Sequence, residues 1–89
     1  MENITIDDIK KTIRLVMADL IEDDPESFDD NSLLIEELGI NSITIVQIFL
    51  SCQDKYDIVL ANEMNLAEPM SIQSLAQTVL NKINAGGVN

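Results

Sequence analysis

The spacing of apolar residues in three segments of the chain is the feature that most limits how it can fold. In residues 5–21 they recur at intervals of three and four, as Ile6, Ile9, Ile13, Val16 and Leu20. This spacing places them on one face of an α-helix, which has about 3.6 residues per turn. Thr5 is a suitable N-cap, and the two aspartates that follow it give the helix an acidic first turn. We predict an amphipathic helix over residues 5–21, with three basic residues on its remaining surface, Lys10, Lys11 and Arg14.

Two further segments have helical spacing. Asn41 is a good N-cap for a second helix from Ser42 to Tyr56. Its apolar residues lie nearly all round the helix, which must therefore be central or have an exposed apolar face: Ile43, Ile45, Val46, Ile48, Phe49, Leu50 and Cys52. Ser71 precedes a last helix with apolar residues at Ile72, Leu75, Ala76, Val79, Leu80 and Ile83.

The connections between these helices are irregular. Residues 22–37 form a long acidic loop in which Pro25 breaks the first helix, and residues 32–35 form a short turn. We expect Leu34 or Ile35 to attach this loop to the core, and Gly39 to make a tight turn with positive φ. Residues 57–60 form an extended connector, and residues 62–66 a short third helix. The predicted fold is all-α, a small four-helix bundle with three longer helices, one short third helix and a long first loop.

Charge and residue usage exclude several classes of function. The chain has 89 residues, one domain by length, and a net charge of −11. Such a charge disfavours nucleic acid and anionic membranes, and favours basic protein partners. The chain has no histidine, so it has no Ser-His-Asp or Cys-His arrangement and few transition-metal ligands. An EF-hand needs Gly at the sixth position of its loop, where this chain has Phe28 if counted from Asp23 and Asp29 if counted from Asp24. No metal site is therefore predicted.

Targeting and redox signals are also absent. A single cysteine, Cys52, cannot form an internal disulfide, and we read it as a small buried hydrophobe. No apolar run reaches the ~18 residues of a membrane span, and the N-terminus lacks the pattern of a signal peptide. We therefore expect a cytoplasmic monomer.

Ser42 is a polar residue at the start of the most apolar segment. At a helix N-terminus its hydroxyl lies near unpaired backbone N–H groups and the positive end of the helix dipole. An anionic group attached there, such as a phosphodiester, would be favoured by both. No local base can activate the hydroxyl for turnover, so Ser42 is better suited to being modified than to catalysis.

The segment "LGINSITIVQIFLSCQDKYDIVL" resembles the acyl and peptidyl carrier proteins. Leu38, Gly39 and Ser42 match the family's Leu-Gly-x-Asp-Ser-Leu core, and Ile43 replaces its last Leu conservatively. The order of helices over residues 5–84 is also similar. The chain departs from the family at Asn41, where the family has Asp; the capping role is kept and the charge is lost.

The resemblance implies a non-catalytic carrier with 4'-phosphopantetheine on Ser42. A separate Mg-dependent phosphopantetheinyl transferase would install the group from coenzyme A, and acyl intermediates would be held as thioesters on its thiol. The expected partners are this transferase and acyl-loading, ketosynthase or other tailoring enzymes. We expect a carrier domain over residues 1–84 and a flexible tail at 85–89, in a chain that is free-standing or excised from a larger synthase.

The second helix is where partners of this family dock. Fatty-acid carriers place acidic residues there, whereas this helix has a single acid, Asp54. We expect the docking residues near Ser42 to be apolar, with Ile45 and Phe49 forming an exposed pair next to Ile43 and Val46, although both could equally be core. A carrier of polyketide-type specialised metabolism is preferred, with a fatty-acid or peptidyl carrier as the alternative. A small acidic protein-interaction module, or a small enzyme, are the alternatives from other classes.

Overall fold

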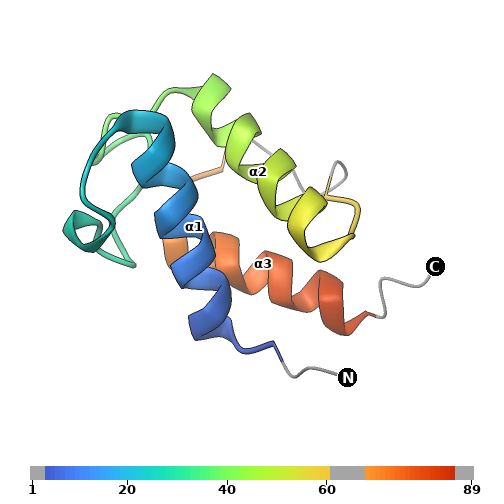
Figure 1. Cartoon of the computed structure of the whole chain (residues 1–89). Helices are drawn as coiled ribbons and strands as arrows, with labels where there is room; N and C mark the ends of the chain where they lie inside the picture. The colour runs from blue at the N-terminus through green and yellow to red at the C-terminus, as the bar shows by residue number, and fades with distance from the viewer. Residues whose placement is uncertain (1–3, 61–67, 86–89) are drawn as a thin grey trace.

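The computed structural model describes residues 4–60 and 68–85, which form helices and irregular connections without a strand (Figure 1). Three α-helices are present in these ranges: α1 (Ile6–Ile21), α2 (Ser42–Tyr56) and α3 (Ile72–Asn84). A short 3-10 helix, η1 (Pro25–Ser27), follows α1. The predicted all-α fold is therefore confirmed. The predicted short helix over residues 62–66 and all but the first residue of the predicted 85–89 tail lie outside the described residues.

The predicted N-caps begin all three helices. Thr5 forms a capping box with Asp8, in which Thr5 Oγ1 accepts from Asp8 N and Asp8 Oδ2 accepts from Thr5 N, both at 3.2 Å. Ser71 forms the equivalent box with Ser74 at the start of α3, at 3.1 and 2.9 Å. Each box satisfies backbone donors that a helix leaves unpaired at its first turn.

Helices α1 and α2 end at the predicted residues, Ile21 and Tyr56, but the end of α1 has a different cause from the one predicted. Pro25 does not end α1; the helix stops at Ile21 because Glu22 adopts a left-handed conformation with φ of 57°. Pro25 instead is the first residue of η1, where its fixed φ is compatible with helix and its missing N–H is not needed. Asp57 ends α2 in the same left-handed way, with φ of 54°. Neither position carries the glycine that usually signals such an end.

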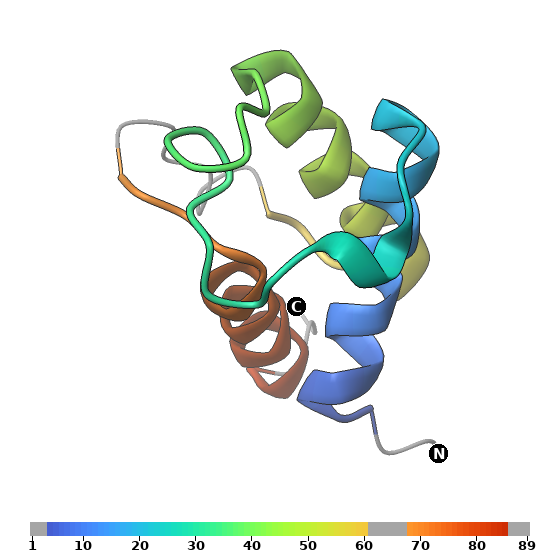
Figure 2. The same ribbon diagram turned by 90° about the vertical axis from the view of Figure 1, so that its left-hand side faces the viewer.

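The core is aliphatic, as its composition requires. Both α2 and α3 pack against α1 (Figures 1 and 2). On α1 the fully buried residues, Ile9, Ile13 and Met17, follow a step of four. Leu20, which we predicted on the packed face, is 37% exposed at the edge of that face. The helices contribute eleven buried side chains: Ile9, Ile13, Met17, Ile45, Ile48, Phe49, Cys52, Ile72, Leu75, Ala76 and Val79.

The long connection between α1 and α2 is held in place by α3. Leu34 is fully buried, and its N–H donates to the carbonyl of Met70 at 2.7 Å. In the opposite direction, Gln73 N donates to the carbonyl of Asp30 at 2.9 Å. Leu34 is thus the residue that attaches the loop to the core, while Ile35 is exposed. Figure 2 shows this connection running beside the start of α3 before it turns toward α2.

Candidate functional site

A tight turn leads the chain into α2. The N–H groups of Glu37 and Leu38 donate to the carbonyl of Leu33 at 2.9 and 3.0 Å, and Ile40 N donates to Leu34 O at 2.9 Å. Gly39 has φ of 72°, as predicted. A Cβ added to Gly39 would meet no atom within 4 Å, so glycine is needed here for its backbone conformation and not for space.

Asn41 fixes the first turn of α2. Its Oδ1 accepts from Thr44 N at 2.8 Å, and its carbonyl accepts the first helical hydrogen bond, from Ile45 N at 3.2 Å. The N–H groups of Ser42 and Ile43 precede that first helical bond, so the helix leaves both without an internal partner. The sequence predicted both this cap and the first residue of the helix.

Ser42 is exposed at the amino end of α2, shortly after the turn at Gly39. Within the described residues its hydroxyl makes no hydrogen bond. No group of three potential metal ligands occurs among these residues either. An accessible hydroxyl beside two unpaired N–H groups can hold an anionic substituent, because the N–H groups and the helix dipole both stabilise negative charge. The residues present therefore fit a phosphodiester attached at Ser42.

For Ile45 and Phe49 the prediction of an exposed docking pair is wrong, and the alternative, that both belong to the core, is confirmed. Ile45 is fully buried and Phe49 is 2% exposed, because α2 uses that face to pack on the other helices. The exposed apolar residues are Ile43 at 71% and Leu50 at 51%, with Val46 partly exposed between them. We call Ile43, Val46 and Leu50 the outer stripe of α2, since they lie three and four residues apart on one side. Leu50 was missed, although its spacing of seven from Ile43 indicates the same face.

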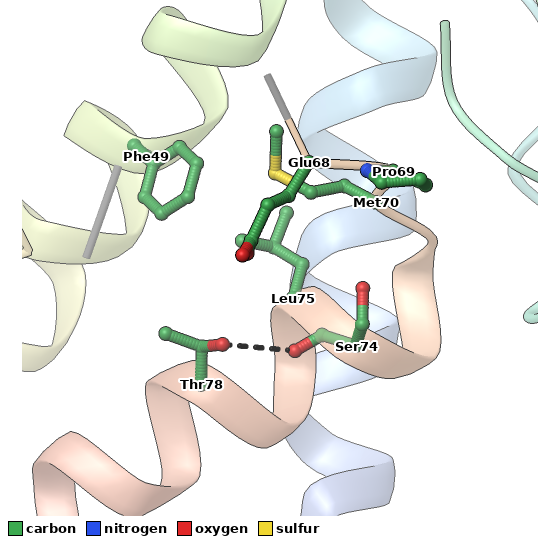
Figure 3. A pocket seen from close by; sticks show the side chains of 7 residues that line it. All are labelled: Phe49, Glu68, Pro69, Met70, Ser74, Leu75 and Thr78. Atoms are coloured by element: carbon green, nitrogen blue, oxygen red, sulfur yellow. Dashed lines mark hydrogen bonds between the residues drawn. The ribbon is translucent and has the colours of Figure 1, made fainter. Parts of the chain in front are cut away.

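A small cavity lies between α2 and α3, on the other side of α2 (Figure 3). The ring of Phe49 faces Met70 and Leu75 across it, and Glu68, Pro69, Ser74 and Thr78 complete the described lining. Its volume is about 100 Å³. This is smaller than the ~150 Å³ apolar cavity that takes up benzene. The described residues thus leave room for only a few carbon atoms.

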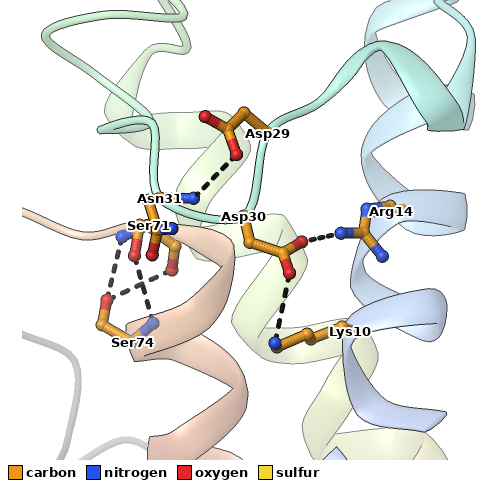
Figure 4. A network of polar contacts seen from close by, with 7 residues as sticks. All are labelled: Lys10, Arg14, Asp29, Asp30, Asn31, Ser71 and Ser74. Carbon is orange, nitrogen blue, oxygen red and sulfur yellow. Dashed lines mark hydrogen bonds and ion pairs between the residues drawn. The ribbon is translucent and has the colours of Figure 1, made fainter. Parts of the chain in front are cut away.

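A polar network that sequence reasoning did not identify joins the loop to α1 (Figure 4). The Asp30 carboxylate pairs with Lys10 Nζ at 3.1 Å and with the Arg14 guanidinium. The two bases are one helical turn apart on α1, which the sequence shows. Eight acids lie between Glu22 and Glu37, and the path of the loop decides which of them reaches these two bases. The sequence contains no signal for that path.

Cys52 is fully buried on α2 and faces the core, as predicted. Burial raises the pKa of its thiol to about 11, so the thiol stays protonated and unreactive at neutral pH. It takes no part in the site at Ser42, which lies at the other end of the helix.

The geometry defines a class of protein: a small helical domain that presents one accessible serine at a helix N-terminus. Residues 11–79 match the family model described as the phosphopantetheine attachment site. The chain belongs to this family of carrier proteins, and its cofactor is 4'-phosphopantetheine. Carrier domains of this kind are generally non-catalytic and work with partner enzymes. None of the described helices combines the length and hydrophobicity of a membrane span.

Proposed function

We propose that the chain carries acyl intermediates on a 4'-phosphopantetheine group attached to Ser42. The observation that carries this assignment is the exposed, unbonded hydroxyl of Ser42 at the amino end of α2. The turn at Gly39 and the cap at Asn41 hold that end in place. Leu38 supports the turn because its side chain packs against the core.

Loading of the carrier is a transfer to the Ser42 oxygen. Ser42 Oγ forms a bond to the phosphorus of coenzyme A that bears the pantetheine, the pyrophosphate bond breaks, and adenosine 3',5'-bisphosphate leaves. The proton of Ser42 must pass to a base on the transferase, because the chain has no histidine and the hydroxyl contacts no base among the described residues. Once bound, the group supplies a thiol that holds acyl groups as thioesters. The N–H groups of Ser42 and Ile43 would then face a phosphodiester.

The partners of such a carrier would meet the outer stripe of α2. Ile43 and Leu50 are exposed large apolar residues on the helix that begins at Ser42, and α2 has no acid before Asp54. A partner that binds this helix therefore needs an apolar surface more than a basic one. This pattern favours a carrier of polyketide-type specialised metabolism, in which acyl-loading and ketosynthase enzymes are the partners. The preference would fail if only fatty-acid synthase enzymes loaded and elongated the chain.

Intact-protein mass spectrometry tests the attachment site. The chain is incubated with coenzyme A, Mg²⁺ and a promiscuous phosphopantetheinyl transferase, beside Ser42→Ala and the matched control Ser51→Ala, which removes a hydroxyl from the same helix. We expect a gain of one phosphopantetheine mass that is lost in Ser42→Ala and kept in Ser51→Ala. A gain that survives Ser42→Ala, or no gain with several transferases, would contradict the proposal and favour a protein-interaction module.

A further inference from the structure

A groove between α1 and the end of α2 has the chemistry of a second binding surface. We propose that this groove binds an acidic segment of a partner protein that also presents an apolar side chain. We call it the α1 groove and define it by six residues of its lining, Asp8, Lys11, Thr12, Leu15, Lys55 and Tyr56. The proposal does not depend on modification of Ser42.

The α1 groove is built from two helices that a hydrogen bond holds together. Tyr56 OH donates to Thr12 Oγ1 at 2.9 Å, which joins the last turn of α2 to the middle of α1. The hollow beside this bond has a volume of about 540 Å³. Leu15 lines it and is 52% exposed, so the hollow offers an apolar surface to an occupant.

A second hollow continues the α1 groove toward η1. It has a volume of about 390 Å³ and shares Lys11 and Leu15 with the first. Pro25 lines its far end, with Asp24 and Glu26 beside it. The surface is therefore long enough for a short peptide and differs in charge along its length. An acidic group of the peptide would lie at the end with Lys11 and Lys55, and an apolar side chain would lie over Leu15.

The charges of the α1 groove select an acidic occupant. Neither Lys11 nor Lys55 forms an ion pair within the described residues, whereas Lys10 and Arg14 are both paired with Asp30. Lys55 Nζ lies 5.9 Å from the centre of the Tyr56 ring, which leaves the ammonium able to take a carboxylate. Asp8 also lines the groove, but its Oδ2 already accepts from Thr5 N in the capping box of α1. The chain has sixteen acids and five bases, so a groove with two cations and one carboxylate is a local exception.

Other classes of occupant fit the α1 groove poorly. A basic segment would meet both lysines, and a wholly apolar one would bury them without a partner, which is costly. A polyanion such as nucleic acid, or an anionic membrane, would extend over the surrounding surface, where a net charge of −11 repels it. A short acidic and apolar peptide segment avoids these costs.

The α1 groove lies away from the modified serine. Tyr56 is the last residue of α2 and Ser42 its first, so the helix alone separates them by about 20 Å at 1.5 Å per residue. One partner could therefore hold the carrier at α1 while another enzyme acts near Ser42.

Fluorescence anisotropy with a defined probe tests the proposal. The probe is a labelled helical peptide with leucines at i and i+4 flanked by glutamates, titrated into the full chain at 0.15 M salt. We expect Lys11→Glu, Lys55→Glu and Leu15→Ala each to weaken binding at least five-fold. Replacing the peptide's glutamates by glutamines should weaken it similarly, and Ser42→Ala should bind as the wild type does.

Two controls separate a specific site from general charge and apolar effects. Lys82→Glu on α3 makes the same change in charge as Lys11→Glu, and Leu50→Ala removes an equally exposed leucine from the outer stripe of α2. Both should change the affinity less than two-fold, and melting curves establish that every variant is folded. Equal weakening by Lys82→Glu, or no binding by the wild type at millimolar peptide, would overturn the proposal. Because the peptide needs no loaded carrier, either result is independent of the loading experiment.

Discussion

At the scale of single residues, Asp30 connects three parts of the molecule. Its side chain pairs with Lys10 and Arg14 on α1, and its carbonyl accepts from Gln73 on α3. We expect Asp30→Asn to lower the free energy of unfolding by about 1 kcal/mol, because two partly buried cations lose their shared anion. Urea unfolding measures this. Asp29→Asn, at an exposed neighbour, is the matched control and should change stability by less than ~0.5 kcal/mol; equal effects would mean that the network adds nothing.

Asn41 has a capping role that can be separated from its charge. Asn41→Ala removes the bond to Thr44 N and should destabilise the fold by about 1 kcal/mol. Asn41→Asp keeps the cap and places a negative charge at the positive end of α2, so its melting temperature should match or exceed that of the wild type. Because the family has Asp here, the same variant should also be loaded faster by transferases that read this position. A melting temperature unchanged in Asn41→Ala would show that the cap is dispensable.

Cys52 makes the stability depend on alkaline pH. Its pKa rises from 9.0 to about 11 on burial, so between these values the unfolded chain loses the proton while the folded chain keeps it. Deprotonation then favours unfolding, and stability is full below pH 9 and is lost as the pH rises toward 11, by about 3 kcal/mol in all. Burial also raises the pKa of Tyr56, which acts in the same direction. Urea midpoints from pH 8 to 11 should fall less steeply for Cys52→Ala; parallel slopes would exclude Cys52 as the cause.

At the scale of helices, the C-terminal ends carry strain that can be removed. Glu22 adopts φ of 57° at the end of α1, a conformation that costs roughly 1 kcal/mol with a side chain. Glu22→Gly removes that cost and also a negative charge from the carboxyl end of the helix, so we expect a gain of about 0.5 kcal/mol after the greater flexibility of the unfolded chain is counted. Glu22→Ala keeps the strain and serves as the control in urea unfolding. If both variants were equally stable, charge and not backbone conformation would explain the change.

The sequence predicted where the helices begin and end better than which of their faces are exposed. The starts of all three helices followed from Thr5, Asn41 and Ser71, since capping depends on neighbouring residues only. The exposed face of α2 did not follow, because apolar residues lie nearly all round that helix and its pattern has no single direction. Packing against α1 and α3 decided it, burying Ile45 and Phe49 and leaving Ile43 and Leu50 outside. The Asp30 network was equally hidden, because it depends on the path of a long loop.

At the scale of the whole molecule, charge is unevenly distributed. Eight acids lie between Glu22 and Glu37, and no base lies between Arg14 and Lys55. Repulsion within this region opposes folding and is screened by salt, with a Debye length of about 10 Å at 0.1 M. We expect the melting temperature to rise as salt is added at neutral pH, and to rise further with divalent cations. A melting temperature that stays constant from 10 mM to 500 mM salt would show that the loop's charges are already too far apart to interact.

The pair of hydrogen bonds between the α1–α2 connection and the start of α3 has a consequence for how the molecule opens. Leu34 donates to Met70, and Gln73 donates to Asp30, so neither amide can exchange its hydrogen with solvent while α3 stays docked. Both should therefore give the same free energy of opening in hydrogen exchange, set by the release of α3. The connection that leads to Ser42 would then become mobile only when α3 separates from it.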